Sequence, residues 1–202
     1  MLIDSQIDMQ VVFEASTIDE VLTAINDLTL DVLVVDQRMS GRDGIWLVEN
    51  INQSFLGRGE WPPTMIVTAP YFAVELDIAV MRSGAADFVV EESGPEELLS
   101  AIRKACDENQ SLDVFSLKEL FDGLQLDRRS DSGFNLALAN LDSGARSALD
   151  AFAAGLSDSE ISQQLKVPQS SLKTLFREIL VHFGFTSKEQ LALALYESEH
   201  LA

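Results

Sequence analysis

The chain contains a single cysteine, Cys106, among 202 residues, and it therefore cannot form an internal disulfide. Such cysteine usage is typical of a reducing cytoplasm. Long apolar runs are also missing, since none approaches the roughly 18 residues that a membrane-spanning helix needs. The start, "MLIDSQIDMQ", has neither the basic region nor the apolar core of a signal peptide. These absences predict a cytoplasmic protein without a membrane segment.

Basic residues and histidines are scarce. There are 14 Lys and Arg against 33 Asp and Glu, a formal charge of −19, which opposes nonspecific attraction to nucleic acid or to an anionic membrane. The two histidines, His182 and His200, lie at a helix end and in the tail. No nucleophile–base pair and no metal-ligand spacing is present. We therefore expect no enzyme and no cofactor.

Up to residue 108, short apolar runs alternate with stretches of helical periodicity. The strand-like runs are "QVVFEA", "DVLVVD", "TMIVT" and "ADFVV". One helical stretch opens with the capping box Thr17-x-x-Glu20, and another begins at Pro95. Strands that alternate with helices of 10–15 residues predict βαβ units and a parallel sheet. Because the strands are continuously apolar, we expect both faces of the sheet to be covered.

The rest of the chain has a different character. Residues 109–139 have the pattern of a linker, in which "SLKELFDGL" fits a short amphipathic helix and "DRRSDSG" a flexible connection. Residues 140–202 are helical throughout, with the segments "SGARSALDAFAAG", "SDSEISQQLKV", "QSSLKTLFREILVHFG" and "SKEQLALALYESEHL". The sequence thus predicts an α/β domain at 1–108 and an all-α domain at 140–202.

The longest of these helices has two distinct faces. Its apolar stripe consists of Leu172, Phe176, Ile179, Leu180 and Phe183, and the opposite face presents Ser170, Lys173, Thr174, Arg177 and Val181. Two cations among short polar side chains suit the DNA major groove, where cations contact phosphates and short donors contact base edges. The same pattern also fits the solvated face of a helical bundle.

The segment "GLSDSEISQQLKVPQSSLKTLFREILVHFGF" resembles the LuxR/NarL-type helix-turn-helix, a four-helix DNA-binding domain. The matching positions are Gly155, Ser157, Asp158, Glu160, Ile161, Leu165, Lys173 and Gly184. The resemblance implies promoter DNA as a partner. It makes Lys173 a phosphate or base-edge contact and places Ser170, Thr174 and Arg177 on the surface of the recognition helix.

This helical part departs from the pattern in charge and at three positions. Pro168 stands where the family has a capping serine, Leu175 replaces a histidine, and Glu178 replaces an asparagine at the margin of the DNA face. From residue 141 onward, the sequence contains 5 basic and 8 acidic residues. A DNA-binding module normally carries a basic stripe.

The first domain resembles the receiver domain of two-component response regulators, with a flavodoxin-like (CheY-like) sheet. Three motifs carry the resemblance: "DQRMSGRDG", "IVTA" and "SGAADFV". They imply that Asp36 is at the phosphoacceptor position and that Thr68 and Phe88 are at the switch positions.

The chemistry of a receiver is nevertheless expected to be lost. The family pairs the phosphoryl group with a lysine, and Glu91 occupies that position, followed by Glu92. It also binds Mg²⁺ through an acidic pair after a first strand that this sequence does not show. Asp4 and Asp8 cannot replace this pair, because they lie in a turn-like segment before "QVVFEA" and not after a strand. Without a metal and a cation, a phosphoryl group is repelled by a bare carboxylate.

The missing first strand is central in the family's strand order, 2-1-3-4-5. Right-handed crossovers then predict three helices on one sheet face, leaving the other to the helix at 95–108 and to "MLIDSQI". An uncovered apolar face favours association. We therefore predict an obligate dimer, with the partner or the segment 113–124 covering this face. A start recorded downstream of the true one would also account for the missing strand.

Two functions follow from these patterns. The first is a dimeric, phosphorylation-independent transcription regulator that binds promoter DNA and uses a pseudo-receiver domain to dimerise or to sense a partner protein. The second is an interaction protein, an adaptor or anti-regulator that heterodimerises with another regulator without binding DNA. A third hypothesis, a conventional phosphorylated regulator, is disfavoured because Glu91 stands at the lysine position.

Overall fold

The computed structural model describes residues 2–106, 112, 114–124 and 132–198. The chain divides into two compact units, residues 1–108 and 109–202. Each unit is described by itself below. In the described part of the chain, no helix is long and apolar enough to cross a membrane.

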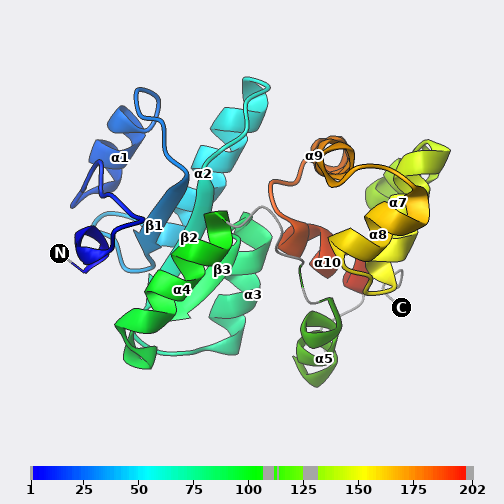
Figure 1. Cartoon of the computed structure of the whole chain (residues 1–202). Coiled ribbons are helices and arrows are strands. Elements are labelled where there is room, and N and C mark those ends of the chain that lie inside the picture. Colours follow the sequence, from blue (N-terminus) through cyan, green and yellow to red (C-terminus); the bar gives the residue numbers. More distant parts are fainter. Residues whose placement is uncertain (1, 107–111, 113, 125–131, 199–202) are drawn as a thin grey trace. The chain divides into compact units, whose positions relative to one another are not determined.

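A three-stranded parallel sheet forms the centre of the first unit (Figure 1). Its strands are β1 (Val32–Asp36), β2 (Thr64–Ala69) and β3 (Asp87–Val90), in the order β1-β2-β3. They correspond to three of the four apolar runs predicted as strands. The strand predicted at "QVVFEA" is wrong: residues 10–15 are in no strand, and one isolated bridge joins Thr17 to Ser40. Strand propensity is not enough where no neighbouring strand is available for backbone pairing.

Three helices cover one face of this sheet, as the right-handed crossovers predict. They are α1 (Ile18–Ala24), α2 (Gly44–Gly57) and α3 (Val74–Ser83). The core on this side contains Ile18, Val21, Leu47, Val48, Ile51 and Val80 against Val35, Met65 and Val67. The capping box predicted at Thr17 and Glu20 opens α1, and Gly84, with φ of 90°, ends α3.

The second face is covered by α4 (Pro95–Cys106) and by the N-terminal segment. Ala101 and Ile102 of α4 pack on Ile66 and Val89 of the sheet. Ile3, in the short 3-10 helix η1 (Ile3–Ser5), and Met9 pack against the same cluster.

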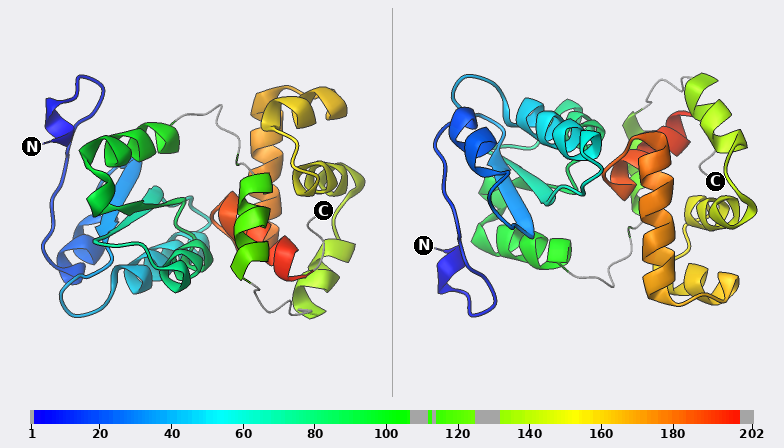
Figure 2. Two further views of the ribbon diagram at one scale, coloured as in Figure 1. Left: turned by 90° about the horizontal axis from the view of Figure 1, so that it is seen from below. Right: turned by 90° about the horizontal axis from the view of Figure 1, so that it is seen from above.

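In the residues that the structure describes, the second unit contains helices and no strand (Figure 2). Four of them form the helix-turn-helix region: α7 (Ser143–Ala153), α8 (Asp158–Leu165), α9 (Gln169–Phe183) and α10 (Lys188–Glu197). Its core contains Phe152, Ile161, Leu172, Phe176, Ile179 and Leu191, each exposed by 2% or less. The stripe expected on the longest helix is therefore buried, except that Phe183 is half-buried.

The described parts of residues 109–139 form two further helices of this unit, α5 (Val114–Leu124) and α6 (Ser132–Ala139). α5 packs on α10, where the Tyr196 hydroxyl donates to Asp122 Oδ1 at 2.8 Å. α6 packs on α9 through Phe134 and Phe183, whose ring centroids are 4.7 Å apart. Within the second unit, α5 buries Phe121, whose ring centroid lies 5.1 Å from that of Tyr196. Coverage of the first unit's sheet by residues 113–124 stays a prediction.

Candidate functional site

The four receiver positions lie on the three strands or directly after them, and the carboxyl ends of parallel strands meet at one edge of the sheet. Asp36 is the last residue of β1 and the Cα partner of Thr68 on β2. Phe88 on β3 is the Cα partner of Val67. Glu91 follows β3 directly and is exposed at the start of the 3-10 helix η2 (Glu91–Ser93). The topology thus brings Asp36, Thr68 and Glu91 to the carboxyl edge of the sheet, and Phe88 lies one residue further back, because Thr68 pairs with Val89.

The Asp36 carboxylate is exposed and takes part in the loop that follows it. Its Oδ1 accepts a hydrogen bond from the backbone N–H of Arg38 at 2.8 Å, so that it closes a turn of its own backbone. The same loop returns when Gly44 N donates to Gln37 O at 2.8 Å. The carboxylate therefore has a structural role that requires no phosphoryl group.

The last two residues of the loop, Asp43 and Gly44, each have a structural role at the start of α2. The Asp43 carboxylate caps α2 by accepting from Trp46 N at 2.8 Å. A Cβ on Gly44 would overlap the carbonyl oxygen of Asp36 and lie 2.7 Å from Val35 Cγ1. Only glycine allows this approach of α2 to the end of β1.

Carboxylates do not gather around Asp36 in a form that suits a metal ion. Among the residues described, no three His, Cys, Asp or Glu side chains are grouped so that they could hold one. Asp4 and Asp8, the remaining acidic candidates near the N-terminus, have other roles: Asp4 Oδ1 accepts from Val11 N at 3.0 Å, and Asp8 pairs with Arg103 at 2.8 Å. The donor set thus does not fit the Mg²⁺ that receivers bind.

An aromatic patch that was not predicted from the sequence lies beside the switch positions. Tyr71 and Phe72, in the loop after β2, are exposed by 62% and 54%. The Phe72 ring lies 6.4 Å from the Phe88 ring. The only signal was the pair "YF" two residues after "IVTA".

The second candidate site is the outward face of α9. Ser170, Thr174 and Arg177 are exposed, and Lys173 is half-buried. The Thr174 hydroxyl donates to Ser170 O at 3.2 Å, one helical turn back. Val181, exposed by 56%, continues the same face toward the end of the helix. α9 thus presents together the residues that were predicted to contact DNA.

The turn between α8 and α9 is tight. Lys166 ends α8 in the left-handed conformation, with φ of 56°. Ser162 spans the turn, since its hydroxyl donates to Val167 O at 2.6 Å and its carbonyl accepts from Val167 N at 3.1 Å. Pro168 precedes α9 and supplies no side-chain cap. The turn is therefore held from α8, a role for Ser162 that no sequence pattern indicated.

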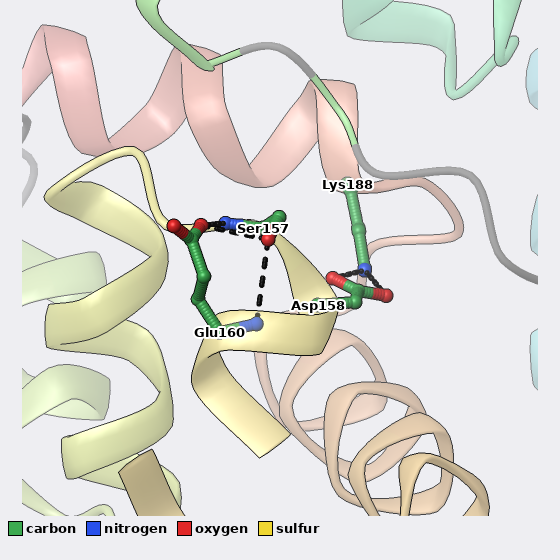
Figure 3. A network of polar contacts seen from close by, with 4 residues as sticks. All are labelled: Ser157, Asp158, Glu160 and Lys188. Carbon is green, nitrogen blue, oxygen red and sulfur yellow. Dashed lines mark hydrogen bonds and ion pairs between the residues drawn. The ribbon is translucent and has the colours of Figure 1, made fainter. Parts of the chain in front are cut away.

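A network of polar contacts ties α8 to α10 (Figure 3). The capping box predicted at Ser157 and Glu160 opens α8, and these hydrogen bonds lower the pKa of Glu160. At Asp158, the residue after Ser157, both carboxylate oxygens accept from Lys188 Nζ at 2.7 Å. Lys188 was not identified from the sequence, because 30 residues separate it from Asp158.

Comparison with known proteins agrees with this architecture. Residues 1–103 match the response regulator receiver domain. The chain is 27% identical over 192 residues to the transcriptional regulatory protein LiaR of Bacillus subtilis, covering 95% of this chain and 86% of LiaR. It is 22% identical over 197 residues to the nitrate/nitrite response regulator protein NarL of Escherichia coli, covering 97% and 87%.

Among solved structures, the chain is similar to the Salmonella typhimurium response regulator RcsB, with 20% identity, a TM-score of 0.49 and coverage of 98% of this chain and 89% of RcsB. The match over residues 1–103 shows that the chain belongs to the response regulator family. Together with the helical unit, it makes this protein a two-domain regulator of the LuxR/NarL type.

Proposed function

We propose that this protein is a transcription regulator that binds promoter DNA through α9, acts in the cytoplasm as a homodimer, and does not depend on phosphorylation of Asp36. The observation that carries the proposal is the division of α9 into two sides. Leu172, Phe176, Ile179 and Leu180 fix the helix on the core, while Ser170, Lys173, Thr174 and Arg177 lie on the outward side.

Each outward residue has a role in this proposal. Lys173 and Arg177, four positions apart, neutralise phosphates or read guanine edges, and an arginine does the latter with two hydrogen bonds. Ser170 and Thr174 supply short hydroxyl groups on the same side of the helix. Glu178, exposed next to Arg177, repels phosphate and limits how far the helix face extends.

The receiver unit supports control without phosphate. The Asp36 carboxylate already accepts a hydrogen bond from Arg38 N, and this bond closes the loop that follows β1. The exposed Glu91 and Glu92 follow β3, at the edge where a phosphoryl group would need a cation. We infer that this unit responds to contact with a protein, either a second copy or another regulator.

The open edge of β1 supports dimerisation. Thr64 N donates to Asp31 O, and Gln37 N donates to Thr68 O. Because backbone groups alternate along a strand, Val32 and Val34 direct theirs to the other edge, where no described strand lies. The chain also exposes apolar residues ahead of α1, namely Leu2, Ile7, Val12 and Phe13. An unpaired edge and exposed apolar side chains both favour association, and a stable monomer in analytical ultracentrifugation at micromolar concentration would contradict this part of the proposal.

The alternative function is an adaptor that heterodimerises with another regulator and does not bind DNA. The formal charge of −19 and Glu178 favour it, because both oppose contact with phosphate. In that case α9 is a solvated helix face.

Gel-shift titrations on genomic promoter fragments separate the two functions. We expect salt-sensitive binding by the wild type, and Lys173→Ala should weaken it and reduce the salt slope by about 1. Lys118→Ala on α5 is the matched control, since it removes the same charge away from α9. Absence of binding to every fragment, together with co-purification of another receiver protein, would support the adaptor.

A further inference from the structure

Lys188 lies at an unusual place for a cation, the first residue of α10. The N-terminus of a helix carries partial positive charge, so a lysine there is unfavourable unless an anion offsets it. Asp158, the first residue of α8, is that anion, with both of its oxygens 2.7 Å from Lys188 Nζ (Figure 3). The two side chains are exposed by only 21% and 17%. The pair thus joins the first turns of two helices in a site largely withdrawn from water.

The same ammonium group also reaches the recognition helix. Lys188 Nζ lies 4.4 Å from the centroid of the Phe176 ring, in the geometry of a cation–π contact. Phe176 is 2% exposed, and its ring meets the Phe152 ring of α7 at 5.5 Å in an edge-to-face arrangement. One lysine therefore connects α10 directly to α8 and α9, and through Phe176 to α7.

Phe176 is one of the buried residues that set the rotation of α9 about its axis. At 100° per residue, the side chains of Lys173 and Arg177 project roughly 60° and 100° from that of Phe176. A rotation of Phe176 against the core would turn both cations by the same angle. What holds Phe176 therefore contributes to where the proposed DNA face points.

We propose that Lys188 is a positioning residue for DNA recognition, which fixes the orientation of α9 through Phe176 and that of α8 through Asp158 without contacting DNA itself. This proposal rests on the proposed function of α9. It requires a cation at position 188, because an apolar side chain would leave the Asp158 carboxylate half-buried without this partner. The first turn of α8, which carries Asp158, would then be displaced toward a position that hydrates the carboxylate.

The test uses the full chain with Lys188→Met, Lys188→Arg and Asp158→Asn. DNA affinity is measured at several salt concentrations, at a temperature where circular dichroism shows each variant to be folded. We expect Lys188→Met to lower affinity by about tenfold, a size typical of residues that act through other residues. Its salt slope should equal that of the wild type, since no phosphate contact is lost. Lys188→Arg should restore most of the affinity.

Each other outcome is decisive. A salt slope reduced by about 1 in Lys188→Met would show that Lys188 contacts phosphate, which overturns the positioning role. Unchanged affinity in both Lys188→Met and Asp158→Asn would overturn it as well. If Lys188→Met does not fold, Asp158→Asn alone decides, because it removes the charge and preserves the shape. Failure of the wild type to bind any DNA would instead refute the proposed function; amide chemical shifts along α9 would then test the positioning contact, and unchanged shifts in Lys188→Met would overturn it.

Discussion

Arg103 on α4 holds Asp8 of the N-terminal segment through two hydrogen bonds, from Nε to Oδ2 at 2.8 Å and from Nη2 to Oδ1 at 3.2 Å. A third, from Nη2 to Gln6 Oε1, measures 2.9 Å. The segment that carries Ile3 and Met9 is thereby held over the second core of the first unit. Because both charged side chains are about half exposed, the pair contributes little to global stability, and its effect is local.

Arg103→Gln is therefore expected to release this segment without unfolding the sheet. Amide hydrogen exchange of residues 2–11 should become faster at neutral pH, while exchange in β1, β2 and β3 stays slow. Lys104→Gln, a neighbour on α4, is the control with the same loss of charge. The hydrogen bonds from Arg103 lower the pKa of Asp8, so the contact is complete above the ordinary value of 3.8 and is lost as pH falls through the lowered pKa. Unchanged exchange in Arg103→Gln would show that the apolar contacts alone hold the segment.

Asp77 on α3 and Asp87 at the start of β3 have raised pKa values. For Asp77 burial is the main cause, and the charge of Asp87 adds to it. For Asp87 burial again comes first and the charge of Glu97 adds to it, while the hydrogen bond from Phe88 N and the charge of Lys104 oppose it. The folded state therefore binds protons more tightly at both carboxyl groups than the unfolded chain does.

Asp77→Asn is expected to stabilise the protein at neutral pH. A carboxyl group whose pKa is raised on folding lowers stability as pH rises from the unfolded value of 3.8 through the folded one, and this loss is complete above the folded pKa. The variant cannot ionise there, so denaturant midpoints should exceed those of the wild type at pH 7 and converge with them near pH 4. Glu49→Gln, a change at an exposed position of α2, is the control for the loss of one negative charge. A gap between Asp77→Asn and wild type that is the same at both pH values would contradict this explanation.

Gly44→Ala should destabilise the first unit by about 1–3 kcal/mol, the usual cost of overpacking. The added Cβ meets the backbone of Asp36 and the side chain of Val35, neither of which can move without disturbing β1. Gly57→Ala provides the matched control at the other end of α2, because a Cβ there meets nothing within 4 Å. Urea denaturation compares the two. Equal midpoints would show that the loop adjusts to admit the methyl group.

The local elements of this fold could be predicted from the sequence. "DVLVVD", "TMIVT" and "ADFVV" became the three strands, because buried parallel strands are continuously apolar. Both capping boxes occur where predicted, at Thr17 and at Ser157, since a cap depends on residues three positions apart. The burial of one side of α9 follows in the same way from helical periodicity.

The long-range contacts could not be predicted. Arg103 and Asp8 are 95 residues apart, and Lys188 and Asp158 are 30 apart, so no spacing rule relates them. The run "QVVFEA" failed for a related reason: its β-branched residues favour a strand, but pairing depends on a neighbour that the segment itself does not supply. At the candidate sites, the sequence predicted where Asp36 and the α9 residues lie. It predicted neither the hydrogen bond from Arg38 N to Asp36 nor the contact of Lys188 with the Phe176 ring.

Asp36 is expected to remain unmodified when the protein is incubated with acetyl phosphate and Mg²⁺. A phosphoryl group needs positive charge beside its acceptor, and the residue directly after β3 is Glu91 instead of a lysine. Intact-mass spectrometry of the treated protein provides the measurement. Asp36→Asn is the control, because an asparagine Oδ1 can still accept the hydrogen bond from Arg38 N, so its fold and DNA affinity should match those of the wild type. A phosphoryl adduct that forms on the wild type and is lost in Asp36→Asn would show that the site has kept its chemistry despite Glu91, and DNA affinity would then have to be measured with and without the adduct.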